Sequence, residues 1–189
     1  MLKVITVCTG NICRSPMAQA LLAAEFQRRG IEAEVISVGL LESDRPYDPE
    51  AVAAMSSRGI DISSGVSNTL SPTLLKAADL AICMERLHVR EVVTTTPELW
   101  PRTFTIKELV RRATMVGART PPEDFGAWLA RVHEGRSTRD LLGQSPDDDL
   151  PDPYMQSAKV FERTAAELEY LLERFVSLGF THFGNTAVP

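Results

Sequence analysis

This sequence has few cysteines, no long apolar segment and no excess of basic residues. The only cysteines among its 189 residues are Cys8, Cys13 and Cys83, and this odd, low count excludes the disulfide framework of a small secreted protein. No stretch approaches the roughly 20 apolar residues that a membrane-spanning helix needs. Residues 2–7 are not a basic segment followed by a long apolar one, so we expect no signal peptide and a cytoplasmic location.

The charge balance is mildly acidic. Lys and Arg total 20 and Asp and Glu total 25, which gives a net charge of -5. This balance argues against a protein held broadly on nucleic acid or on an anionic membrane, since both attract positive charge. A hydrophobic share of 44% supplies a sizeable core, and 189 residues favour one domain at roughly 150 residues per domain.

Short β-branched runs alternate with segments of helical periodicity along the chain. This alternation is typical of right-handed crossovers and a parallel sheet. We expect strands near residues 2–7, 33–38, 79–84 and 102–106, and helices near residues 17–29, 48–58, 86–93, 107–114, 121–135 and 157–178. The predicted fold is a single α/β domain of three layers, in which a twisted four-stranded parallel sheet is flanked by helices.

The predicted domain covers residues 1–180. Residues 137–153 are polar and interrupted by proline, so we expect a long loop there. Residues 113–149 form an additional helical and loop segment, which could be a lid, a partner surface or padding. Residues 181–189 are expected to be a flexible tail.

The most informative segment joins the first predicted strand to the first predicted helix, and residues 8–15 read C-T-G-N-I-C-R-S. Unpaired backbone N–H groups and the helix dipole favour an anion at such a place. Gly10 permits a tight turn, and Asn11 tolerates a left-handed conformation. Arg14 can direct two N–H donors at a phosphate. The turn between the first strand and the first helix is therefore predicted to bind phosphate.

A cysteine at the mouth of this turn is favoured as a thiolate, which is a nucleophile aimed at phosphorus. The Ser15 hydroxyl can hydrogen-bond the sulfur of Cys8, and we also expect Ser15 to cap the first helix. A zinc site is less consistent with the pattern, because no second Cys or His pair lies nearby to complete four ligands. The loop is not a Walker A motif, because it has no Gly-Lys-Ser/Thr. An inert buried cysteine would not explain Arg14 in the same turn.

Residues 8–16 resemble the signature loop of low-molecular-weight protein tyrosine phosphatases of the bacterial type. That family pairs the loop with a late D-P-Y, and this chain has Asp152-Pro153-Tyr154. Shorter matches to the family lie at residues 37–39, 48–51, 59–62 and 79–85. The resemblance covers about residues 2–108 and 150–178.

The resemblance implies hydrolysis of phosphotyrosine through a phosphocysteine on Cys8, with Asp152 as general acid and then general base. It implies that Arg14 and the loop bind the phosphate, without a metal or other cofactor. The expected binding residues are Thr9, Gly10, Asn11, Ile12, Cys13, Ser15 and Tyr154. Tyr154 either stacks on the substrate ring or packs against the protein. Cys13 either packs in the first helical turn or forms a reversible disulfide with Cys8, and the resemblance favours the disulfide.

The chain also departs from the family. Many relatives have a His and an Arg after G-I-D-I, and residues 63–68 contain neither, so we expect Ser37 or a water to support Asn11 instead. Tyr47 is the only aromatic in the loop after Gly39 that could reach the substrate. We expect Cys83 in the core and residues 147–149 in a solvated acidic loop. His88, His133 and His182 are expected on helix surfaces or in the tail, without a role.

Three other functions are compatible with the same fold. An arsenate reductase would need a downstream cysteine pair, and only Cys83 follows the loop. A protein arginine phosphatase resembles the chain at Thr9 but tends to have a Thr at the position of Ile12, where a bulky side chain should favour a flat phenol. A non-catalytic phosphoprotein-binding module would be expected to lose Cys8 or Asp152. Residues 84–88 resemble bacterial phosphatases of polysaccharide export, so a bacterial tyrosine kinase or a polysaccharide-export protein is the expected partner.

Overall fold

The computed structural model describes residues 1–180, and the predicted tail and His182 lie outside them. Its four strands pair only in parallel, in the order β2-β1-β3-β4, which confirms the predicted sheet. The strands are β1 (Leu2–Cys8), β2 (Ala33–Gly39), β3 (Leu80–Cys83) and β4 (Thr103–Thr105). Because β1 lies in the middle of the sheet, the loop that follows Cys8 emerges between β2 and β3.

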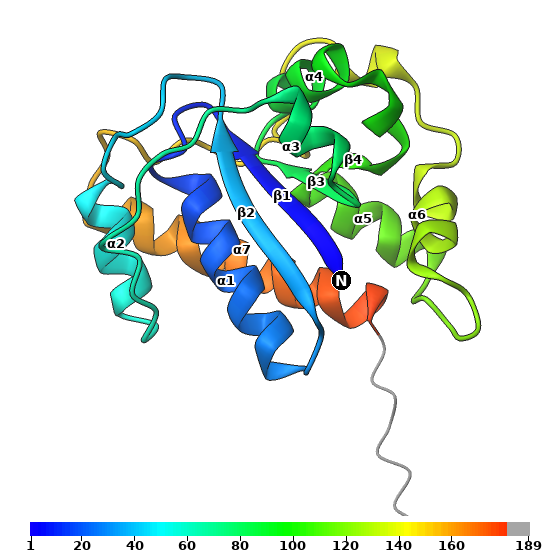
Figure 1. The fold of residues 1–189 in the computed structure, drawn as a ribbon, viewed down its shortest axis with the longest axis horizontal. Helices are drawn as coiled ribbons and strands as arrows, with labels where there is room; N and C mark the ends of the chain where they lie inside the picture. The colour runs from blue at the N-terminus through cyan, green and yellow to red at the C-terminus, as the bar shows by residue number, and fades with distance from the viewer. Residues whose placement is uncertain (181–189) are drawn as a thin grey trace, which may run out of the picture.

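Helices cover both faces of the sheet (Figure 1). The helices and 3-10 turns are α1 (Arg14–Arg28), α2 (Pro49–Ser56), α3 (Pro72–Lys76), α4 (Arg86–Thr95), η1 (Pro97–Arg102), α5 (Ile106–Val116), α6 (Phe125–His133), η2 (Thr138–Leu141) and α7 (Ala158–Gly179). Sequence periodicity missed α3 and η1, because each is short and begins at a proline. No helix within residues 1–180 is long and apolar enough to cross a membrane.

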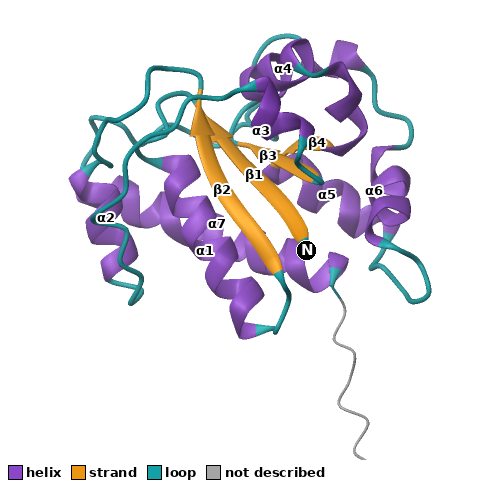
Figure 2. Ribbon diagram, in the orientation of Figure 1, coloured by secondary structure: helices purple, strands orange, loops and turns teal. Residues whose placement is uncertain are grey.

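The two faces of the sheet are covered by different helices, because successive strand residues point to opposite sides. Val4 packs with apolar residues of α1, α2, α5, α6 and α7 in the larger core. Ile5 and Val7 pack on the other side with residues of α3, α4, η1 and η2. Cys83 is fully buried in this smaller core, as expected. The predicted three layers are confirmed, and Figure 2 shows the loops at the carboxyl ends of β1 and β2 gathered at one edge.

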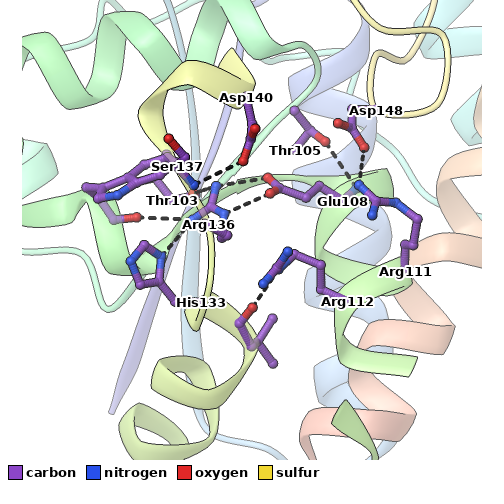
Figure 3. Close-up of polar contacts among 12 residues, drawn as sticks. Thr103, Thr105, Glu108, Arg111, Arg112, His133, Arg136, Ser137, Asp140 and Asp148 are labelled. Carbon is purple, nitrogen blue, oxygen red and sulfur yellow. Dashed lines mark hydrogen bonds and ion pairs between the residues drawn. The ribbon is translucent and has the colours of Figure 1, made fainter. Parts of the chain in front are cut away.

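The additional segment, residues 113–149, is anchored on the core. Trp128 of α6 is fully buried and its indole N–H donates to the carbonyl of Gly117 at 3.0 Å. Figure 3 shows Arg136 reaching the Glu108 carboxylate, with N···O distances of 2.7 and 2.9 Å. The guanidinium lies 4.0 Å from the ring centroids of both Trp100 and Phe104. Within the described residues this segment therefore adds to the hydrophobic core, and the loop expected at 137–153 includes the short turn η2.

Candidate active site

The phosphate loop lies at the carboxyl edge of the sheet, where β1 ends and α1 begins. The backbone carbonyl of Thr9 accepts the N–H groups of Leu40 and Leu41 at 2.8 and 3.1 Å. A side chain at Gly39 would meet Asn11 and the Thr9 carbonyl at 2.9 Å, so only glycine lets the end of β2 approach this closely. The loop is therefore fixed at its first residues by the strand beside it.

The sulfur of Cys8 is almost completely buried and faces hydrogen-bond donors. It lies 3.0 Å from the Ser15 hydroxyl, and the Asn11 backbone N–H donates to it at 3.2 Å. The amide of Asn11 donates to the same hydroxyl at 2.8 Å, so the hydroxyl proton can donate to the sulfur, which is nearer than the Val38 carbonyl at 3.4 Å. These donors stabilise a thiolate and also a departing sulfur. Ser15 lies inside α1 and does not cap it, because the helix begins at Arg14 with Cys13 as its N-cap.

Asn11 has the left-handed conformation expected, with φ of 49°. The expectation that Ser37 supports it is wrong, because the buried Ser37 hydroxyl has no hydrogen-bond partner among the described residues. Instead, the backbone N–H of Asn68 donates to the side-chain oxygen of Asn11 at 2.7 Å. A backbone group thus supports the loop where many relatives have a histidine. Every residue except proline has a backbone N–H, so this donor could not be identified from the sequence.

Arg14 is 1% exposed and lies between two carboxylates. It donates to Glu85, the N-cap of α4, to the Leu150 carbonyl at 2.8 Å and to Asp152 at 2.8 Å. Its Nε has no partner within residues 1–180. The chain thus brings Asp152 to Arg14 from 138 residues away. Glu85 was given no role from the sequence, since nothing in residues 84–88 shows that a buried arginine lies opposite.

A cavity of about 90 Å³ opens beside the sulfur. Its lining residues are Cys8, Thr9, Gly10, Ile12, Cys13, Arg14, Leu41, Arg45, Asp152 and Tyr154. Leu41 and Arg45 were missed, because the loop after β2 has no motif that marks them. Asn11 and Ser15 support the loop from behind and do not line the cavity. Tyr47 does not line the cavity either, because its ring packs against Gly65.

A model of the family described as low molecular weight phosphotyrosine protein phosphatase matches residues 3–121. The chain belongs to this family. The low molecular weight phosphatase is thus a protein phosphatase and a hydrolase, as the signature loop predicted. The match ends before Asp152, whose position beside Arg14 comes from the three-dimensional structure.

Several relatives resemble this phosphatase over different shares of its length. The probable low molecular weight protein-tyrosine-phosphatase EpsP of Ralstonia solanacearum is 39% identical over 106 residues, which are 56% of this chain and 71% of the relative. The protein-arginine-phosphatase of Bacillus subtilis is 36% identical over 110 residues, 58% and 73% of the two chains. The low molecular weight protein-tyrosine-phosphatase Etp of Escherichia coli is 28% identical over 168 residues, 88% and 87% of the two chains.

Solved structures confirm the fold of the phosphatase. A low molecular weight protein tyrosine phosphatase from T. tengcongensis has a TM-score of 0.71 at 31% identity, covering 94% of this chain and 99% of that chain. A YwlE mutant from Bacillus subtilis has a TM-score of 0.70 at 28% identity, covering 94% and 97%. Both tyrosine and arginine phosphatases are thus among the proteins that this one resembles.

The acidic run before the D-P-Y motif is not a solvated loop, which corrects the expectation for two of its three residues. Asp148 is buried and accepts hydrogen bonds from Arg86 at 3.0 and 2.7 Å and from Arg111 at 2.7 Å. Asp149 accepts the backbone N–H groups of Arg86 and Ser145, both at 2.7 Å. Asp147 is exposed, as expected. The run therefore anchors the loop of the phosphatase that carries Asp152.

Two histidines also lie differently from the prediction. His88 is fully buried and contacts the Thr9 hydroxyl at 2.9 Å, so it is not a helix-surface residue. His133 is half-buried, and its ring packs edge-on against Trp100 with centroids 5.3 Å apart.

Cys13 lines the cavity as a free thiol, and burial raises its pKa.

Proposed function

We propose that this phosphatase hydrolyses phosphotyrosine in proteins through a phosphocysteine on Cys8. One observation carries the proposal: the cavity beside the Cys8 sulfur also contains Arg14 and Asp152, which are paired at 2.8 Å. A nucleophile, a phosphate-binding guanidinium and a proton donor are the groups that this reaction needs.

In the first step the Cys8 thiolate attacks phosphorus, so that a P–S bond forms as the P–O bond to the phenol breaks. Arg14 and the loop N–H groups hold the phosphoryl oxygens, while Glu85 keeps the guanidinium in place. The protonated carboxyl of Asp152 gives its proton to the leaving phenol oxygen.

In the second step a water molecule attacks the phosphocysteine. Asp152, now a carboxylate, accepts the proton of the water as the new P–O bond forms and the P–S bond breaks. The sulfur leaves as a thiolate, which the Ser15 hydroxyl and the Asn11 N–H stabilise. Inorganic phosphate and the protonated Asp152 remain, so the enzyme returns to its starting state.

The walls of the cavity favour an aromatic leaving group. Ile12, Leu41 and Tyr154 place apolar surface around the sulfur, and 45% of Tyr154 is exposed at the rim, where its ring can stack on a phenol. Phosphoarginine is the second candidate, because the protein-arginine-phosphatase of Bacillus subtilis is 36% identical over 110 residues. Ile12 favours the phenol, since its bulk narrows the cavity around a flat ring.

Matched peptides that carry phosphotyrosine or phosphoarginine in one sequence would test this proposal, with Cys8→Ser as the inactive control. We expect the phosphotyrosine peptide to have the higher kcat/KM. Equal or faster release of phosphate from phosphoarginine would contradict tyrosine specificity. Reduction of arsenate with thioredoxin would contradict the hydrolase mechanism.

We further propose a phosphotyrosine-bearing protein in the cytoplasm as the partner, with a bacterial tyrosine kinase or a polysaccharide-export protein as the first ones to test. The support is the resemblance of residues 84–88 to bacterial phosphatases of that group. Incubation with an autophosphorylated kinase of this kind should remove its phosphate. If the enzyme dephosphorylates phosphotyrosine peptides but not the kinase, the proposed partner is wrong and the proposed activity stands.

A further inference from the structure

The mechanism gives no role to the buried imidazole of His88. This residue is the third of helix α4 and is fully buried. Its Nε2 lies 2.9 Å from the Thr9 hydroxyl oxygen, and its Nδ1 lies 3.0 Å from the backbone nitrogen of Glu85. His88 thus connects Thr9, which follows the nucleophile Cys8, to Glu85, which holds Arg14.

These two contacts decide which nitrogen of His88 is protonated. A backbone N–H can only donate, so Nδ1 must accept from Glu85 and carries no proton. Burial, followed by the positive charges of Arg14 and Arg90, lowers the pKa of His88 to about 3, so the ring is neutral near pH 7. Its single proton is therefore on Nε2, which donates to the Thr9 hydroxyl oxygen.

This donation restricts the Thr9 hydroxyl. The oxygen uses one lone pair for Nε2–H, so its own proton cannot point toward His88. The Thr9 backbone is held by Leu40 and Leu41, and the residue lines the cavity beside the sulfur. The hydroxyl proton therefore points away from His88, on a residue that lines the cavity.

We propose that His88 is a positioning residue, which orients the Thr9 hydroxyl as a hydrogen-bond donor to a phosphoryl oxygen of the substrate. This inference rests on the proposed function of the loop. The donor strengthens as charge shifts onto the phosphoryl oxygens, so it acts mainly on kcat. The competing explanation is that His88 only accepts the Glu85 N–H and so stabilises the start of α4.

Two substitutions separate these roles, because each can reproduce the hydrogen bond of only one ring nitrogen. In His88→Asn the side-chain oxygen can replace Nδ1 as the acceptor for Glu85, but nothing replaces Nε2. In His88→Gln the longer side chain can place an N–H near Nε2 and donate to Thr9, while the acceptor for Glu85 is lost. Rates are compared with p-nitrophenyl phosphate below the melting temperature of the least stable variant.

The positioning role predicts that His88→Asn lowers kcat about 10-fold with a smaller change in KM, whereas His88→Gln stays within about 3-fold of the wild type. Thr9→Val should lower kcat to a similar extent, and adding it to His88→Asn should cause little further loss. Thr9→Ser, which keeps the hydroxyl, is the matched control. The proposal would be overturned if His88→Asn kept the wild-type kcat while His88→Gln lost it. It would also be overturned if the losses in kcat from Thr9→Val and His88→Asn were additive in the double variant.

Nitrogen-15 NMR of the wild-type imidazoles is a second measurement that needs no variant of His88. We expect an Nε2-protonated neutral His88 whose signal shifts when inorganic phosphate binds and changes in Thr9→Val. A charged ring or a proton on Nδ1 would contradict the inference. If the wild type hydrolyses neither p-nitrophenyl phosphate nor a phosphotyrosine peptide, the proposed function fails instead.

Discussion

Replacing Asp148 by Asn should destabilise the protein and slow catalysis from outside the cavity. The carboxylate is 4% exposed and accepts three hydrogen bonds from Arg86 and Arg111. Removing one partner of a buried ion pair costs about 3–5 kcal/mol. Half of the Arg111 side chain is exposed, so solvent screens its share, and Asn keeps one acceptor oxygen. We therefore expect a loss of about 2 kcal/mol, which corresponds to ~4–8 °C in melting temperature.

The contribution of Asp148 to stability depends on pH in a predictable direction. Burial alone would raise the pKa of Asp148, but Arg111 and Arg86 outweigh burial and hold the pKa below its ordinary value of 3.8. The charged carboxylate therefore adds stability above about pH 4, and this contribution is lost as the pH falls through the lowered pKa. The difference in unfolding free energy between wild type and Asp148→Asn should be constant between about pH 5 and 7 and shrink below about pH 4.

Denaturant unfolding at several pH values measures this difference, and Asp147→Asn is the matched control because Asp147 is the exposed neighbour in the same run. The control should change stability by less than about 0.5 kcal/mol. Turnover should fall several-fold in Asp148→Asn, since Leu150, two residues on, accepts from Arg14 and the same loop carries Asp152. Equal stability of the two variants at pH 7 would refute the anchoring role of Asp148.

Three further outcomes follow from the cavity. Arg14→Lys should lower kcat by at least ~100-fold in a phosphatase assay, because one ammonium cannot replace a planar guanidinium that bonds two groups at once. Asp152→Asn should slow phenyl phosphate more than p-nitrophenyl phosphate, since a good leaving group scarcely needs the proton; equal losses would place the acid elsewhere. Peroxide should oxidise the Cys8 thiolate to a sulfenic acid, which the Cys13 thiol converts to a disulfide with loss of water, and dithiothreitol should restore activity. Mass spectrometry should detect that bridge, and a bridge to Cys83 instead would contradict its place in the core.

The parts of this protein that the sequence predicts are those set by local pattern. Alternation of apolar runs predicted all four strands. The place of the loop between β1 and α1 was predicted as well, because Cys8 to Ser15 are neighbours along the chain. In such a loop the residue types themselves report the conformation: Asn11 has the left-handed φ that its short polar side chain tolerates.

What the sequence did not predict depends on partners from distant segments. Asp148 looked like part of a solvated acidic run. It is buried because Arg86 donates hydrogen bonds to its carboxylate, although the two residues are 62 positions apart along the chain. His88 looked like a helix-surface residue, and it is buried because Thr9 faces it. Most buried polar residues have a partner that satisfies them, and no local pattern encodes that partner.

The packing of α7 on α1 means that the fold cannot be completed until the end of the chain has been synthesised. All four strands have been synthesised by Thr105, yet the apolar face of α1 is covered by α7, which begins only at Ala158. At about 5–20 residues per second, the 47 positions between Thr105 and Asp152 take the ribosome roughly 2 to 10 s. A nascent chain would thus hold its nucleophile before its general acid, with one face of α1 open to chaperones.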